Sequence, residues 1–247
     1  PNNAVLAIAG DIKAADCLAK VRKYFESIPR QPAPSDVDMT EPPQTEERRQ
    51  TIDDPLARLA RLDMVYHVPQ SLTPDADALS VAGTILSSGR SSRLYENIVR
   101  QKQLSTNVSA SAGESRGPGL FRIGGMVVPG KSVADLEQAI SAEVERLKTG
   151  PIEAWEIEKA RNAARRGFLA SLTSSLSRAV MLSQLAVFYN DPGLINTRYE
   201  RLSSITAADV QRVAKQYLTP QNRTVVITNP KPAAPAPQPG AGKGGLR

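Results

Sequence analysis

The chain has 247 residues, 40% of them hydrophobic and 23% charged, so it is long enough and apolar enough to bury a globular core. Its formal net charge of +6 does not indicate nucleic-acid binding, because no zinc finger, RNP-like aromatic pair or recognition-helix pattern accompanies it. Three of the charges, Lys231, Lys243 and Arg247, also lie in a tail that we expect to be unfolded. The single cysteine, Cys17, excludes a disulfide framework, and we expect it to be a small buried side chain.

Proline marks the predicted domain boundaries. Most of the 19 prolines fall within 29–55 and 230–239, as is typical of linkers and tails. We therefore predict four regions. They are the terminal strand and helix of a preceding half-domain at 1–29, a linker or edge-running extended segment at 30–54, the main half-domain at 55–229 and a disordered Pro/Gly-rich tail at 230–247.

The first region pairs a short apolar run with a helical pattern. Asn3–Ala9 has the length of a strand, and Leu18, Val21 and Phe25 then recur at helical spacing. Pro1–Ile8 shares a proline, an asparagine and an apolar strand, in register, with Pro220–Ile227. Ordinary turn chemistry can produce such an echo, but its position favours two similar half-domains, the first of which ends here.

The main region opens with a strand and a helix. Apolar and polar residues alternate over Arg58–Val68, which predicts a half-buried strand. Thr73 is then placed to cap a helix that Pro74 begins and Gly89 ends.

A second helix is expected to follow directly, capped by Ser91 or Ser92. Arg100 and Lys102 lie near its C-terminal end, where cations suit the helix dipole. Its apolar stripe would consist of Leu94, Tyr95, Ile98 and Val99.

The rest of the main region predicts a hairpin, a set of helices and a final strand. Leu104–Ser115 and Gly119–Pro129 are the hairpin strands, and the last strand is Thr224–Thr228. Capping boxes begin two of the helices, at Ser132 and Thr206. This order of elements predicts an α+β fold, with helices on one face of a mainly antiparallel sheet. Further helices are expected at Ile152–Leu172, Leu176–Tyr189 and Ile195–Leu202.

The longest weakly charged stretch is Gly167–Asn190. A membrane span needs about 20 apolar residues. Arg178 and many serines interrupt this stretch, so we predict a buried pair of helices and no membrane span.

The segment Gly83–Gly113 combines an apolar helix ending on Ser-Ser-Gly, the corner Ser-Ser-Arg-Leu-Tyr, a charged turn and an alternating strand. This order closely resembles the C-terminal half-domain of the pitrilysin/insulysin-type (inverzincin) zinc peptidases, which include the mitochondrial processing peptidase subunits. The resemblance covers about Val65–Asn229 and, separately, residues 1–29. It implies a clamshell of two similar halves and, by analogy with bacterial members, a periplasmic or extracytoplasmic location.

Zinc in that family is bound by an H-x-x-E-H helix, but the single histidine here, His67, has no such motif around it. The resemblance therefore implies zinc in the preceding half, with no metal ligand, cofactor or catalytic residue in this chain. We interpret His67 as a solvated strand residue near Asp63. Ser91, Ser92 and Ser109 lack the base that a serine nucleophile needs.

Many relatives carry a substrate-contacting Arg and Tyr, seven residues apart, around the corner between helix and strand. The resemblance places Val99 and Thr106 at those positions, or Arg100 and Asn107 when the alignment slides by one residue. The tyrosine is absent in either alignment. These four residues are the candidate substrate-binding residues, and a second, similar subunit carrying the Arg/Tyr pair becomes a candidate partner in a heterodimer.

Two functions remain open. The first is the non-catalytic half of a zinc metalloendopeptidase subunit, inactive alone, that helps form a chamber for an extended peptide. The second is a structural, assembly or peptide-binding module of the same fold, whose parent has no peptidase activity. The presence of H-x-x-E-H in the preceding part of the parent would distinguish them.

Overall fold

The computed structural model describes residues 2–35 and 37–231, and the predicted α+β fold is confirmed. One five-stranded sheet has the order β1-β5-β2-β4-β3. The pair β1 and β5 is parallel, and the other three pairs are antiparallel. The strands are β1 (Arg48–Asp54), β2 (Arg61–Val68), β3 (Ser105–Ala112), β4 (Gly119–Val127) and β5 (Arg223–Pro230).

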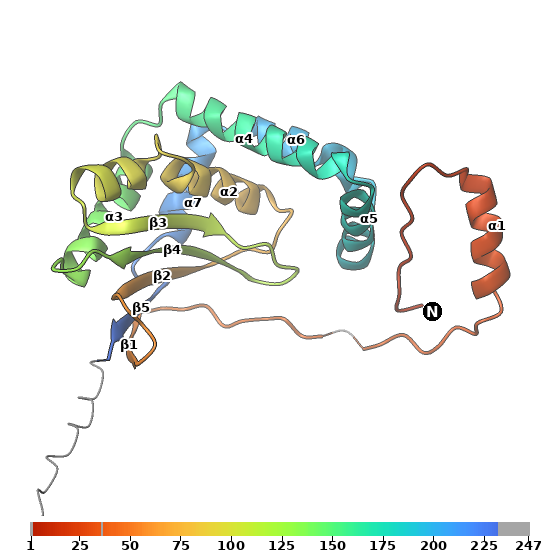
Figure 1. Cartoon of the computed structure of the whole chain (residues 1–247), viewed down its shortest axis with the longest axis horizontal. Helices are drawn as coiled ribbons and strands as arrows, with labels where there is room; N and C mark the ends of the chain where they lie inside the picture. The colour runs from red at the N-terminus through yellow and green to blue at the C-terminus, as the bar shows by residue number, and fades with distance from the viewer. Residues whose placement is uncertain (1, 36, 232–247) are drawn as a thin grey trace, which may run out of the picture.

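The helices that follow β2 lie on one side of this sheet, as Figure 1 shows, with α2, α3 and α7 directly over it and α4 and α6 farther out. None of the described helices is both long and apolar enough to cross a lipid bilayer. The helical elements are α1 (Ala14–Phe25), α2 (Pro74–Ser87), η1 (Tyr95–Gln101), α3 (Val133–Thr149), α4 (Ala154–Thr173), α5 (Ser175–Tyr189), α6 (Leu194–Ser204) and α7 (Ala207–Tyr217).

The core lies between the sheet and its inner helices. The apolar residues that alternate along β2 are at most 5% exposed, which confirms the predicted half-buried strand. They meet fully buried residues of α2 and α7, such as Leu79 and Val213. The β2 residues of this core are Leu62, Met64, Tyr66 and Val68.

Side-chain caps fix several helix starts where the sequence placed them. The Thr73 hydroxyl accepts a hydrogen bond from the Ala76 amide, and Thr206 forms the predicted reciprocal box with Asp209. The cap predicted for the second helix is wrong. The Ser92 hydroxyl instead donates to the carbonyl of Gly89, at 2.7 Å.

The predicted linker contributes to the domain. Its last seven residues form β1, at the edge of the sheet. Earlier in this segment, the Gln44 amide donates to the carbonyl of Arg223 at 2.8 Å. Met39 lies so close to Gly117 that a Cβ added there would be 3.1 Å from the Cβ of Met39. The chain therefore runs along the domain from Met39 onward.

The N-terminal segment differs from expectation in two ways. Asn3–Ala9 is not a strand, because a strand must share its backbone hydrogen bonds with a neighbouring strand and none in the described part of the chain lies beside it. Cys17 is only partly buried, since α1 has no buried residue. The predicted tail falls almost entirely on 232–247, outside the described residues.

Candidate functional site

β3 forms one edge of the sheet and pairs only with β4. Edge strands are commonly protected by charged residues or proline, since their unpaired backbone groups can bind another strand. The sequence of β3, STNVSASA, has neither. The residues of β3 therefore do not prevent another strand from pairing with its outer edge.

One serine of α2 already uses the outer backbone groups of β3. The Ser87 hydroxyl donates to the carbonyl of Ala110 at 3.0 Å, and the Ala110 amide donates to the same hydroxyl at 2.8 Å. This side chain thus occupies the place of a neighbouring strand's backbone. The close approach depends on Gly83, because a Cβ there would lie 3.0 Å from the Ala110 oxygen.

Two hollows follow this edge and share Ser80 and Ala112. The smaller, of about 160 Å³, lies between α2 and β3 beside Ser87. The larger, of about 320 Å³, continues toward the β3–β4 turn, where α5 and α6 form its wall. Together they form a groove that runs along β3 and widens at one end. The apolar residues of the wide end include Leu72, Met181, Leu185, Phe188 and Leu202.

Most charged side chains at the wide end are paired with each other, and the exception is the exposed Arg116, which forms no ion pair within the described residues. Arg198 bonds to Glu114, and the Arg201 guanidinium lies 2.6 Å from the Asp77 carboxylate. Burial raises the pKa of Asp77 above its ordinary value, although Arg201 opposes the change. The binding features of the groove are therefore the apolar wall, the charge of Arg116 and the strand edge beyond Ala110, whose own backbone groups bond to Ser87.

The corner between η1 and β3 holds the four predicted substrate-binding residues. Val99 is half-buried, and Thr106 is exposed. Arg100 is exposed and pairs with Glu96 at 2.9 Å, while Asn107 accepts a hydrogen bond from the Met126 amide at 3.4 Å. The four side chains form no hydrogen bond with one another within the described residues.

The helix at this corner is a π-helix, which sequence periodicity did not predict. The Lys102 amide bonds to the carbonyl of Asn97, five residues earlier, so this turn contains one more residue than an α-helical turn. Such wide turns are frequent at functional sites.

Beneath η1 lies a buried polar cluster that the sequence analysis missed. Glu143 is 3% exposed and accepts a hydrogen bond from Asn97 at 2.5 Å. Nearby, Arg93 and Glu156 form a buried ion pair at 2.7 Å. Burial alone would raise the pKa of Glu156, but Arg93 and the Glu153 amide outweigh it and hold that pKa below its ordinary value. Glu143 and Glu156 are far from Arg93 in the sequence, so only the three-dimensional structure shows that these side chains lie together beneath η1.

The residues present do not fit a zinc site. Within the described ranges, no group of three or more His, Cys, Asp and Glu side chains could hold a metal ion. The Nδ1 of His67 lies 3.1 Å from the Glu41 carboxylate. The predicted neighbour, Asp63, pairs instead with Arg61 at 2.6 Å.

Comparison with protein families matches residues 1–164 to the family described as Peptidase M16 inactive domain. The zinc protease PqqE of Helicobacter pylori is 26% identical over 236 residues, which cover 93% of this chain and 52% of that protein. The chain thus spans about half the length of this curated relative.

Solved structures show the same architecture. The crystal structure of a protease from Helicobacter pylori has a TM-score of 0.82 and 24% identity, covering 90% of this chain and 54% of that one. An inactive peptidase domain from Bordetella parapertussis has a TM-score of 0.66 and 29% identity, covering 73% of this chain and 95% of that one. The second match therefore covers nearly the whole of that domain but only about three quarters of this chain.

Proposed function

Because the chain belongs to the Peptidase M16 inactive-domain family, we propose that its parent is a zinc metallopeptidase and that this half lines a chamber for an extended peptide. The edge of β3 beyond Ala110, where Ser87 no longer occupies the backbone groups, and its adjoining groove carry the proposal. An extended peptide can add to such an edge through main-chain hydrogen bonds, while hollows beside the strand accept its side chains.

Zinc belongs, in this proposal, to the half that precedes residues 1–29. This chain contributes peptide binding and closure of the chamber, and no step of hydrolysis. Val99 and Arg100 lie in η1, and Thr106 and Asn107 lie at the start of β3, the opposite end of that strand from the groove. In this proposal they contact a part of the peptide that extends beyond the groove. Since the Tyr of the Arg/Tyr pair is absent, we propose that a second, similar subunit supplies the pair.

A single substitution at the edge tests the role of β3. Ala112 faces the same side as Ala110, because alternate strand residues direct their backbone groups to the same neighbour. Ala112→Pro removes one outward amide without removing a bond to β4. Ala112→Ser keeps that amide and is the matched control.

The assay uses the zinc-loaded parent and a mixture of quenched-fluorescent peptides, with and without a similar subunit that carries the Arg/Tyr pair. We expect kcat/KM to fall roughly tenfold for Ala112→Pro, the cost of about one main-chain hydrogen bond, and to change little for Ala112→Ser. Equal activity of both variants would contradict the edge proposal. No hydrolysis under any condition would favour an assembly module without peptidase activity.

A further inference from the structure

α5 has apolar residues on two sides of the helix, separated by roughly a third of a turn. At 100° per residue, Met181, Leu185 and Phe188 share the inner face, which lines the wide end of the groove. Leu176, Val180 and Val187 share the outer face, roughly a third of a turn away. On the inner face Leu185 is 3% exposed, although Phe188 at its C-terminal end is 46% exposed. The three outer residues are 73%, 44% and 51% exposed.

A helix that is apolar all round is typical of a buried helix. The sequence predicted burial for this pair of helices, but Leu185 is the one residue of α5 that the described chain buries. Leu169, near the end of α4, is 52% exposed and adds to the apolar residues of this arm. We name the surface formed by Leu169, Leu176, Val180 and Val187 the outer face.

The charge of this region limits what can cover it. From Ala160 to Asn190 the chain has four arginines and no acidic residue. Three of them, Arg165, Arg166 and Arg178, are exposed and form no ion pair in the part of the chain that the structure describes. A complementary surface would therefore be apolar at its centre and acidic at its rim.

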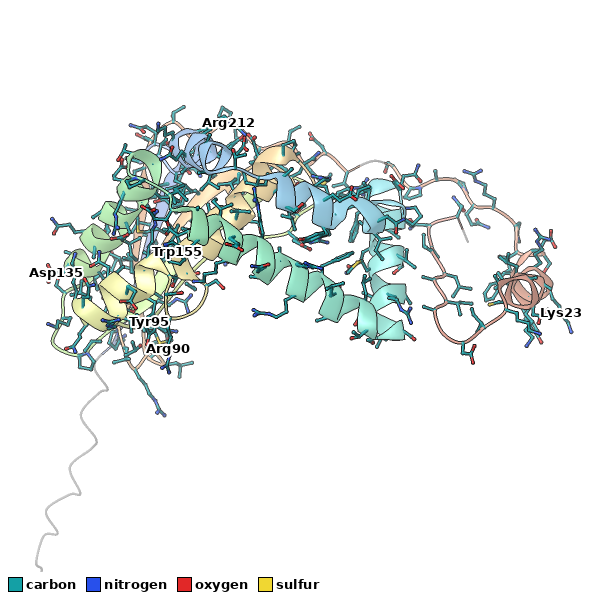
Figure 2. The ribbon with its side chains drawn as sticks, turned by 90° about the horizontal axis from the view of Figure 1, so that it is seen from above. Lys23, Arg90, Tyr95, Asp135, Trp155 and Arg212 are labelled. Atoms are coloured by element: carbon teal, nitrogen blue, oxygen red, sulfur yellow. The ribbon has the colours of Figure 1, made fainter. Side chains whose placement is uncertain are left out.

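The place of the N-terminal segment indicates where such a surface would come from. Figure 1 shows residues 2–29 beyond α5, on the side away from the sheet, and the view from above in Figure 2 agrees, with Lys23 marking α1. The Helicobacter pylori relatives are about twice as long as this chain, which covers 52% and 54% of them. A second body of similar size is thus expected on this side.

We infer that the outer face of α5 is the surface against which the preceding half of the same polypeptide packs, through an apolar patch with an acidic rim. The inference rests on the proposed function for the existence of that half. α1 itself is not the covering element, because its Lys20, Arg22 and Lys23 would meet the arginines of α4 and α5. Its exposed Leu18 and Phe25 are expected to be covered by the same half.

Cysteine labelling tests the inference directly. In a Cys17→Ser background, Val180→Cys reports on the outer face, and Gln138→Cys on exposed α3 is the matched control. Each variant is made in residues 1–247 and in the full parent, and its rate of reaction with a maleimide is measured. We expect labelling at position 180 to be at least about tenfold slower in the parent, because a buried thiol is inaccessible, and labelling at position 138 to be equal in both.

A second pair of substitutions tests the acidic rim. Arg165→Glu with Arg166→Glu in the parent should speed labelling at position 180 several-fold, whereas Arg165→Lys with Arg166→Lys should not. Equal labelling at position 180 in the short chain and the parent would overturn the inference. Slow labelling in the short chain that depends on its concentration would also overturn it, since a second copy would then cover the face. Peptide hydrolysis is not measured, so an inactive parent can still show protection.

Discussion

β2 and α5 are both rich in apolar residues, but only β2 finds all its partners within the described chain. The inward residues of β2 meet α2 and α7 in a closed core, while α5 turns a second apolar face to solvent. The core between the sheet and its inner helices is therefore closed, and the side formed by α4, α5 and residues 2–29 keeps exposed apolar residues. Stability and assembly should depend on different residues.

A core truncation should have the largest effect. Phe121 on β4 is fully buried, so Phe121→Ala is expected to lower the free energy of unfolding by about 3–5 kcal/mol, from lost burial and the cavity left behind. Chemical denaturation of residues 1–247 measures it. Leu176→Ala on the outer face is the matched comparison and should change stability by no more than about 0.5 kcal/mol. Similar losses of stability for Phe121→Ala and Leu176→Ala would contradict the contrast between the closed core and the outer face.

The buried ion pair should come next. Glu156→Gln leaves Arg93 without its charged partner and is expected to cost about 3 kcal/mol at neutral pH. The folded pKa of Glu156 is lowered, so the stability that its charge contributes is present above the ordinary carboxyl pKa of about 4.3 and is lost as pH falls through the lowered value. Denaturation of both proteins at several pH values should show the difference shrinking below about pH 4. A difference in stability between the two proteins that does not change with pH would show that it does not come from the charge of Glu156.

The corner between η1 and β3 provides a test of whether the parent needs a second subunit. Val99→Arg with Thr106→Tyr should raise the activity of the parent alone by about 10²-fold, because a guanidinium and a phenol can stabilise a developing oxyanion. Initial rates on the peptide mixture measure the gain. Val99→Arg with Thr106→Phe keeps the ring without the hydroxyl and should gain less. Full activity of the unmodified parent alone would refute the need for a second subunit.

The smallest change in stability is expected on the outer face. Leu176→Ser should leave the melting temperature of residues 1–247 nearly unchanged and reduce its aggregation, because an exposed apolar side chain is removed. Leu185→Ser, on the inner face of the same helix, should instead destabilise the protein. Light scattering and thermal melts distinguish the two. Equal effects would mean that α5 has no distinct outer face.

Sequence patterns predicted elements whose signals are local. The alternation of β2, the cap at Thr73 and the stop at Asn190 depend on neighbouring residues, so the helix predicted at Leu176–Tyr189 begins within one residue of α5. Membership of the peptidase family was likewise predicted from the order of elements and is confirmed.

Features that depend on distant partners were missed. β1 is polar and charged, and it is a strand only because β5 lies beside it. The bond between Ser87 and Ala110 requires α2 to approach β3 at Gly83, which periodicity does not encode. The π-turn of η1 shares its residue preferences with an ordinary helix. The candidate substrate-binding residues remain a prediction, since their geometry alone identifies no ligand.

Much of the predicted linker, from Met39 to Asp54, is attached to the domain, and this attachment has a mechanical consequence. From Met39 to Asp54 the chain is held against the domain, ending in a strand that runs parallel to β5. In the proposed two-half parent, a hinge between the halves would then lie between α1 and Met39, in about 13 residues that can span at most roughly 45 Å. The two halves would open and close by bending of this short segment. A force applied along it would act first on the hydrogen bonds between β1 and β5, parallel to the strands, before it reached the core.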